Sequence, residues 1–369
     1  MKIALVGLGN AGYTLHLPAL EGIPSAQVVG ACDPDPARRE RAATRFGVAV
    51  FDDFDVMLAQ TKPEVVIVGT PPDSHADYCL RSLAAGAHAL CEKPFVSSLD
   101  EADRVLEAAA RAGRQVALNH EFREMPIFRA LRDQVGKPGV GPVVFAQVWQ
   151  LMDLPPWKEP GWRAELLQRT LYEAGVHLVD YLMALFGEKP LAVSATISSC
   201  GVRESHSDAV ALATFEFSGG RLAQLVQNRL CHGETQYFEV RADGTEASLR
   251  ASFGGRARIT AGLHRSTKPH VRLDYGVSGI AWREVGTRRQ LLGRNPKDPG
   301  MIATRLLFEA TLDAFARGTE PPVSGALARD VLEVIVAAYH SAEVGQRVRL
   351  DDPAVRALVD LRLGAVPVA

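Results

Sequence analysis

Hydrophobic positions in the first 120 residues form short continuous runs, separated by amphipathic segments of helical length. Continuous apolar runs are typical of strands covered on both faces. The pattern predicts strands at 2–7, 26–33, 64–70, 87–93 and 114–120, and helices near 11–22, 36–46, 74–86 and 98–112. In the last helix Ser98 is the expected N-cap, with Glu101 three residues on and Gly113 as the stop. Alternating strands and helices predict an α/β fold with a doubly wound parallel sheet.

After about residue 120 the apolar positions alternate with a period of two, which is typical of a sheet with one apolar face. Strands are expected at 143–150, 191–198, 209–217, 221–228 and 235–242, with hairpin turns at Gly219-Gly220 and Asp243-Gly244. Helices are expected near 164–186, 302–317 and 325–345, and loops at 153–160 and 295–299. We therefore expect a first domain of residues 1–120 and a second, α+β domain of residues 121–369 with a large, mostly antiparallel sheet.

Composition narrows the class of protein. The chain has 369 residues, 47% hydrophobic and 23% charged, with a net charge of -2, so nothing indicates a nucleic-acid or anionic-membrane partner. No apolar run approaches the ~20 residues that span a bilayer. The chain passes from Met1-Lys2 directly into a strand pattern, and its five cysteines have no CxxC spacing. A cytoplasmic protein with reduced thiols and no metal site is expected.

A glycine pattern links the first predicted strand to the first predicted helix. Residues 7–12 read GLGNAG, with Gly7, Gly9 and Gly12 in the GxGxxG positions and Asn10 and Ala11 between them. Such a turn lets a pyrophosphate approach the backbone at a helix N-terminus. Asp33 ends the second strand, where a carboxylate accepts hydrogen bonds from ribose hydroxyls and repels a 2′-phosphate. NAD is therefore favoured over NADP, although Arg38 and Arg39 follow closely.

Two other strand ends are expected at the same edge of the sheet, where ligands of parallel sheets bind. One carries Thr70, Pro71 and Pro72, followed by His75; the other carries Glu92 and Lys93. We interpret these residues as cofactor-binding and place Lys93 where a nicotinamide would lie. A surface lysine is the alternative, but only eight of the 41 Lys and Arg residues are lysines.

A third set of polar residues has helical spacing. Glu173, His177 and Asp180 are four and three residues apart, which places them on one helix face. A lone histidine there would more often belong to a core, but Glu173 and a facing Lys93 favour a catalytic role. Candidate pocket residues are Asn119 and His120 at a strand end, with Tyr172, Trp157 and Trp162; we expect His16 to be structural or adjacent to the cofactor.

The motifs together resemble the Gfo/Idh/MocA oxidoreductase family. The matching stretches are GLGNAG, TPPDSHADYCLRSLAAGAHALCEKP, EAGVHLVDYLMALFG and SGALARDVLEVIVAAYHSAEVGQRVRL. The resemblance implies an N-terminal Rossmann domain, a C-terminal domain with a large open-faced sheet, and contact of Lys93 with cofactor and substrate. It also implies a carboxylate and a histidine at 173 and 177, although the family commonly has aspartate where this chain has Glu173. A cis Lys93–Pro94 bond is a further expectation.

The resemblance predicts an NAD(P)-dependent enzyme that transfers a hydride between nicotinamide and a secondary alcohol or ketone of a sugar, polyol or derivative. His177 is the expected general base, Lys93 the group that stabilises the reacting oxygen, and Glu173 the residue that orients His177 or the substrate. Two alternatives stay open: an NAD-dependent glycosidase that oxidises its substrate transiently, and a non-catalytic dinucleotide-binding protein.

The second domain also predicts self-association. Its sheet has alternating apolar residues but few predicted helices to cover them. A large apolar face is unlikely to stay in water. We expect two such faces to pack together in a homodimer or homotetramer.

Overall fold

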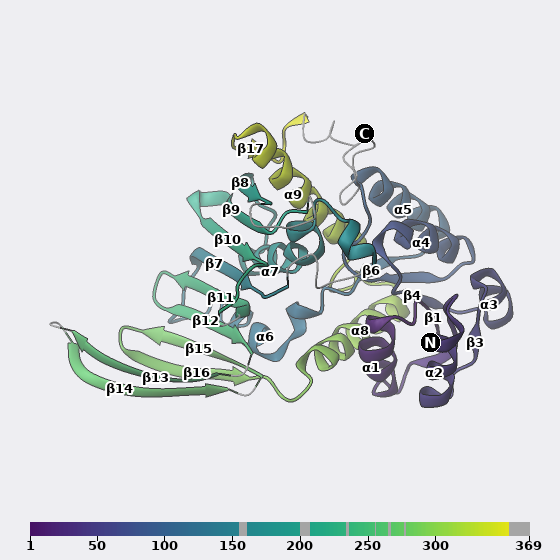
Figure 1. Ribbon diagram of the computed structural model, residues 1–369, viewed down its shortest axis with the longest axis horizontal. Coiled ribbons are helices and arrows are strands. Elements are labelled where there is room, and N and C mark those ends of the chain that lie inside the picture. Colours follow the sequence, from purple (N-terminus) through teal and green to yellow (C-terminus); the bar gives the residue numbers. More distant parts are fainter. Residues whose placement is uncertain are drawn as a thin grey trace.

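The computed structural model describes residues 1–154, 161–199, 207–233, 236–254, 256–264, 267–276 and 278–353. Within these residues the chain builds two large sheets and one long two-stranded arm (Figure 1). No helix in this part of the chain is long and apolar enough to cross a membrane. Cys32, Cys79 and Cys91 are buried free thiols, while Cys200 lies outside the described residues.

The first sheet is parallel, with the strand order β3-β2-β1-β4-β5-β6. Its strands are β1 (Lys2–Val6), β2 (Gln27–Cys32), β3 (Val50–Phe51), β4 (Val65–Val68), β5 (His88–Cys91) and β6 (Val116–Leu118). Its helices are η1 (Gly12–His16), α1 (Leu17–Glu21), α2 (Pro36–Phe46), α3 (Phe54–Thr61), η2 (Pro72–Ser74), α4 (His75–Ala84) and α5 (Leu99–Ala112). This is the expected doubly wound Rossmann sheet.

Local sequence explains most of these elements. All four residues of β4 are buried, as expected for an apolar strand covered on both faces. Ser98 caps α5 by accepting a hydrogen bond from Glu101 N, and Gly113 ends the helix with left-handed geometry, so both expectations are confirmed. The short strand β3 was not predicted, because its two residues leave too short an apolar run, and helix α3 was not predicted either.

The second sheet has the order β16-β15-β12-β11-β7-β10-β9-β8-β17. It is mixed, because β10 pairs with β7 in parallel while the other strand pairs of this sheet are antiparallel. Its strands are β7 (Val143–Leu151), β8 (Ala192–Ser198), β9 (Val210–Glu216), β10 (Leu222–Asn228), β11 (Gln236–Gly244), β12 (Ser248–Phe253), β15 (Gly279–Val285), β16 (Arg288–Arg294) and β17 (Val348–Arg349). The turn at Gly219-Gly220 is confirmed. The turn expected at Asp243-Gly244 was wrong: both residues still belong to β11, and the chain reverses after them.

Helices of the second half pack against this sheet and reach the first. The remaining helices are η3 (Glu121–Glu124), α6 (Pro126–Arg132), η5 (Gly161–Glu165), η6 (Thr170–Gly175), α7 (Val176–Phe186), α8 (Pro299–Arg317) and α9 (Gly325–Val344). Core residues of α7 and α9 join those of the second sheet in one cluster. Phe308, Leu312 and Phe315 of α8 instead pack with Ile3 and Leu5 of the first sheet.

A long hairpin projects from the second sheet. Strands β13 (Arg256–His264) and β14 (Thr267–Gly276) pair only with each other among the described residues and extend away from the body of the molecule (Figure 1). The hairpin was not among the predicted strands.

Candidate active site

The glycine turn after β1 has the steric properties that a dinucleotide requires. Gly7 has φ 95°, and a Cβ there would lie 2.4 Å from the Gly69 carbonyl oxygen. A Cβ on Gly12 would lie 2.1 Å from the Gly7 oxygen, so close packing excludes a side chain at both positions. At Gly9 a Cβ would meet only an Arg38 nitrogen at 3.9 Å. Asn10 and Ala11 follow as the first helical residues. The space beside the Gly9 backbone is therefore open next to a helix N-terminus, which fits a pyrophosphate.

Asp33 lies beside this turn, buried and firmly held. Its carboxylate accepts hydrogen bonds from Leu8 N at 2.8 Å and from Asp35 N at 2.9 Å. Arg38 reaches within 3.5 Å of Asp33 and 3.4 Å of Asp35, while Arg39 donates to the Asp33 and Pro34 carbonyls. A carboxylate in this position at the end of β2 fits the adenosine ribose of NAD.

The strand ends that were expected to meet the cofactor are tied together by buried hydrogen bonds. The His75 imidazole lies between the Thr70 carbonyl, at 2.8 Å, and the Pro94 carbonyl, at 2.9 Å, and burial lowers the pKa of His75. Thr70 also accepts from Ser74, with Pro71 and Pro72 in the turn between them. The end of β4 is thus joined to the loop after Lys93, and the Lys93–Pro94 bond is cis, as the resemblance implied.

The Glu92 side chain anchors the backbone at the end of β5, next to Lys93. Its carboxylate accepts from His16 at 2.7 Å, from Asn119 at 2.6 Å and from the Lys93 backbone at 3.1 Å. Burial alone would raise the pKa of Glu92, but His16, Asn119 and the Lys93 charge outweigh it and hold that pKa at about 2. Glu92 is therefore an anchored carboxylate, and Asn119, an expected pocket residue, belongs to this anchor.

Lys93 meets the second domain at Glu173. The Lys93 ammonium donates to the Glu173 carbonyl at 3.1 Å and lies 3.9 Å from its carboxylate. The carboxylate also accepts from Arg163 at 3.2 Å and from the buried Arg229 at 3.3 Å. Burial raises the pKa of Glu173, but Lys93, Arg229, Arg163 and Arg169 lower it to about 2. Glu173 is therefore ionised and held by cations from three parts of the chain.

His177 lies one turn further along the same helical segment. Its ring packs 4.4 Å from Phe122 and 5.8 Å from His120, measured between ring centres. Burial, with the charges of Lys93 and His120, lowers the pKa of His177 well below its ordinary value. The imidazole is neutral at pH 7, and its Nδ1 has no hydrogen-bond partner among the described residues. It can therefore accept a proton, with a lower pKa than the ordinary imidazole value assumed from the sequence.

The helical segment that carries Glu173 and His177 is not the regular α-helix that the spacing of these residues predicted. Residues 170–175 form a π-helical segment, and a Cβ on Gly175 would lie 2.7 Å from the Gln227 side-chain amide. No hydrogen bond joins Glu173 to His177 within the described residues, so an orienting contact between them is absent in this state. Asp180 pairs with Arg123 at 2.6 Å.

The aromatic candidates are divided. Tyr172 is buried and its hydroxyl donates to the Val96 carbonyl at 3.2 Å, so it belongs to the core and does not line an open pocket. Trp162 is partly exposed beside Arg163, whose guanidinium carbon lies 4.3 Å from the centre of the indole. Trp157 lies outside the described residues.

Sequence reasoning missed four ionisable residues around Lys93 and Glu173. Arg163, Arg169 and Arg229 contribute positive charge at Glu173. Their signal was weak, because arginine is common on this chain's surface. Glu121 is buried next to His120, and its Oε2 has no partner among the described residues. Burial and the Glu92 charge raise the pKa of Glu121 to about 8, so it is a neutral acid at pH 7.

Fold and site together define a two-domain NAD-binding oxidoreductase. The family described as "Oxidoreductase family, NAD-binding Rossmann fold" matches residues 1–120, and the "GFO/IDH/MocA C-terminal domain" matches residues 128–250. The chain belongs to the Gfo/Idh/MocA oxidoreductase family.

Its similarity to the individual proteins named here extends over 60% to 95% of the chain. D-apiose dehydrogenase of Paraburkholderia graminis is 26% identical over 95% of this chain and 89% of its own length. 1,5-Anhydro-D-fructose reductase of Ensifer adhaerens is 27% identical over 60% of this chain and 67% of its own. An oxidoreductase from Agrobacterium radiobacter, crystallised with NAD+, L-tartaric acid and magnesium, has the same fold, with a TM-score of 0.81, 18% identity and coverage of 95% and 98%.

The raised pKa of Glu121 predicts a pH-dependent stability. Its folded pKa of about 8 exceeds the ordinary value of ~4.3 for an unfolded chain. The contribution of its proton is complete below the unfolded pKa and is lost as pH rises through the folded one. Glu121→Gln cannot titrate, so the unfolding free energy of the variant should improve relative to wild type between pH 5 and pH 9.

Guanidinium unfolding midpoints at pH 5, 7 and 9 measure this difference. Glu107→Gln, on the exposed face of α5, is the matched control and should show no such trend. A constant difference between Glu121→Gln and wild type across this range would show that Glu121 is ionised throughout.

Proposed function

We propose that this chain transfers a hydride between NAD and a secondary alcohol or ketone of a sugar, polyol or derivative. The observation that carries the proposal is the contact of Lys93 with Glu173, beside a neutral His177. The relatives named D-apiose dehydrogenase and 1,5-anhydro-D-fructose reductase support a carbohydrate substrate.

The chain's own residues divide the proton chemistry between them. Bound NAD supplies the hydride acceptor, which the protein lacks. In the oxidation direction, His177 takes the proton of the substrate hydroxyl, since a neutral imidazole has a free lone pair. The Lys93 ammonium donates a hydrogen bond to the same oxygen and stabilises the negative charge that develops there. Glu173, held by Arg163 and Arg229, fixes the position of Lys93 and faces the substrate as a fixed anion.

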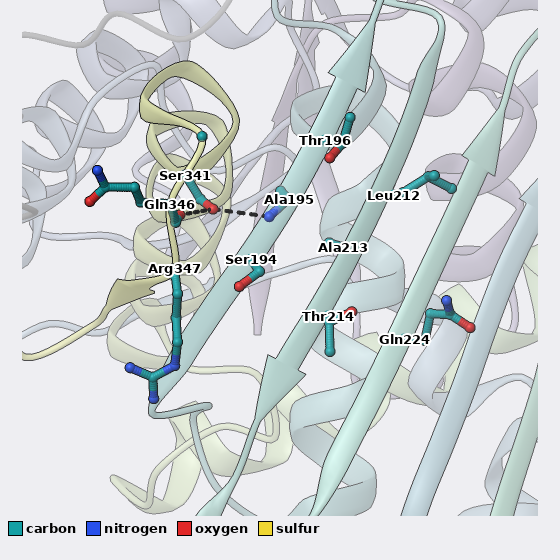
Figure 2. Close-up of a pocket in the computed structure, with 11 residues that line it drawn as sticks. Ser194, Ala195, Thr196, Leu212, Ala213, Thr214, Gln224, Ser341, Gln346 and Arg347 are labelled. Atoms are coloured by element: carbon teal, nitrogen blue, oxygen red, sulfur yellow. Dashed lines mark hydrogen bonds between the residues drawn. The ribbon is translucent and has the colours of Figure 1, made fainter.

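Self-association is a second part of the proposal. Alternate residues of β8, β9, β10 and β7 form one face of the second sheet, which we call the open face: Thr196, Leu212, Thr214, Leu222, Gln224, Gln147 and Trp149. Leu212 and Leu222 are 45% and 42% exposed. Figure 2 shows part of this face, where Thr196, Leu212, Thr214 and Gln224 project beside Gln346 and Arg347 around a hollow of about 330 Å³. We propose that the open face packs against that of a second copy.

Substitution of the catalytic pair tests the chemistry. Lys93→Ala and His177→Ala should each lower kcat by ~10²–10⁴ on the best substrate, because a positioned acid or base is lost. NAD affinity, measured by calorimetric titration, should stay within several-fold, since the glycine turn is untouched. The double variant should lose less than the product of the two, because both residues act on one oxygen and its proton.

The exposed Lys137→Ala and His232→Ala are the matched controls and should keep wild-type kcat. The substrate is found first, by screening NAD and NADP reduction across sugars, polyols and inositols. A His177→Ala enzyme with near-native kcat would make His177 a core residue and end the proposed assignment.

Cofactor preference tests the role of Asp33. NADH should bind more tightly than NADPH, because the buried Asp33 carboxylate would repel a 2′-phosphate. Asp33→Ala should narrow the difference between the two dissociation constants, both obtained by calorimetry. Tenfold tighter binding of NADPH to the wild type, about 1.4 kcal/mol in the other direction, would overturn the preference for NAD.

Light scattering tests the open face. The wild type should scatter as a species of at least twice the 39.9 kDa chain mass. Leu212→Glu should shift the mass downward, because it places a charge in the buried interface. Val56→Glu is the control on α3, where Val56 is equally exposed at 45%. A wild-type mass of 39.9 kDa at working concentration refutes the proposed association.

A further inference from the structure

The turn that precedes Glu173 is held by two residues from distant parts of the chain. Arg169 N and Thr170 N donate to one carboxylate oxygen of Asp208, at 2.9 and 2.6 Å. Leu171 N donates to the Tyr339 hydroxyl at 3.2 Å. The first three backbone N–H groups of this turn are therefore satisfied by Asp208, just before β9, and by Tyr339, on α9.

Asp208 and Tyr339 also bond to each other. The Tyr339 hydroxyl donates to the second Asp208 oxygen at 2.7 Å, so it accepts from the turn and donates to the carboxylate. Burial and the Asp208 charge raise the pKa of Tyr339 well above its ordinary value, which keeps the proton on the tyrosine. Both side chains are buried, and the Thr170 hydroxyl donates to the Asp208 carbonyl at 3.1 Å.

These bonds control where Glu173 lies. Glu173 N donates to the Arg169 carbonyl at 2.8 Å, so Glu173 lies one helical turn after Arg169, whose own N–H is bonded to Asp208. Its own carbonyl is the acceptor for Lys93. Ala209, the residue after Asp208, holds the backbone of Arg229, because Arg229 N donates to the Ala209 carbonyl at 2.9 Å. One segment, 208–209, therefore fixes both the turn and the arginine that pairs with Glu173.

We propose that Asp208 and Tyr339 are positioning residues that set Glu173, and through it Lys93, in the active site. The inference rests on the proposed function for its kinetic readout. Neither residue contacts the glycine turn, so their substitution should affect the chemical step more than NAD binding.

Tyr339→Phe removes the hydroxyl that bridges Leu171 and Asp208, and Asp208→Asn removes the charge that both amides face. Each should lower kcat at least tenfold and keep NAD affinity within several-fold. Tyr181→Phe is the matched control: it also loses a buried hydroxyl, which donates to the Phe128 carbonyl at 2.6 Å, but has no bond to the turn. It should keep wild-type kcat.

A double-mutant cycle separates positioning from a general loss of structure. If Tyr339 acts through Glu173 on Lys93, Tyr339→Phe should cost little kcat in a Lys93→Ala background, where the contact that it positions is already lost. Full multiplicative loss in that background would mean that Tyr339 supports the protein by another route and would overturn the inference.

Hydrogen exchange of the amides at 169–173, followed by mass spectrometry, gives a readout that needs no turnover. Tyr339→Phe and Asp208→Asn should accelerate exchange there, while Tyr181→Phe should not. If the wild type binds NAD but oxidises no substrate, the proposed function fails. The exchange data then still decide whether Asp208 and Tyr339 hold the turn at residues 169–173. Unchanged exchange in both variants, or kcat equal to that of Tyr181→Phe, refutes the positioning role.

Discussion

The contact of Lys93 with Glu173 is the interaction on which the proposed active site depends, because it brings together residues from the two halves of the chain. Lys93 comes from the loop after β5 and Glu173 from the helical segment before α7, and neither sheet alone holds both. A cation and a carboxylate buried together are costly unless each is well hydrogen-bonded. Here Glu92 fixes the lysine's backbone from one side, and Arg163 and Arg229 hold the glutamate from the other.

Charge in this region follows from burial as much as from residue type. Glu92, Glu173 and Glu121 all lie close to Lys93, yet the first two have a pKa of about 2 and the third about 8. The difference is in their partners: Glu92 and Glu173 have nearby donors or cations, whereas burial and the charge of Glu92 are the largest effects on Glu121. The proposed site therefore combines two ionised glutamates with a neutral histidine near Lys93.

Much of the fold could be predicted from the sequence, because apolar runs and their spacing report local burial. The parallel strands, the cap at Ser98 and the glycine turn at residues 7–12 all have local signals. The short β3 and the inclusion of Gly244 in β11 depend on pairing with distant residues, which a local pattern does not contain. For the site, strand ends pointed to Lys93, but the partners of Glu173 come from η5 and from the end of β10, and no spacing rule links them.

The packing of α8 has a consequence for how the chain is synthesised and folded. Phe308, Leu312 and Phe315 belong to the same apolar cluster as Ile3, Leu5 and Leu90, so the nucleotide-binding half is not contiguous in sequence. As residues 1–120 emerge from the ribosome, the part of this apolar cluster that α8 covers stays open until some 180 residues later, by subtraction of 120 from the start of α8 at Pro299. A nascent Rossmann half would therefore expose apolar surface that invites chaperone binding, and neither half can complete its core before the other is made.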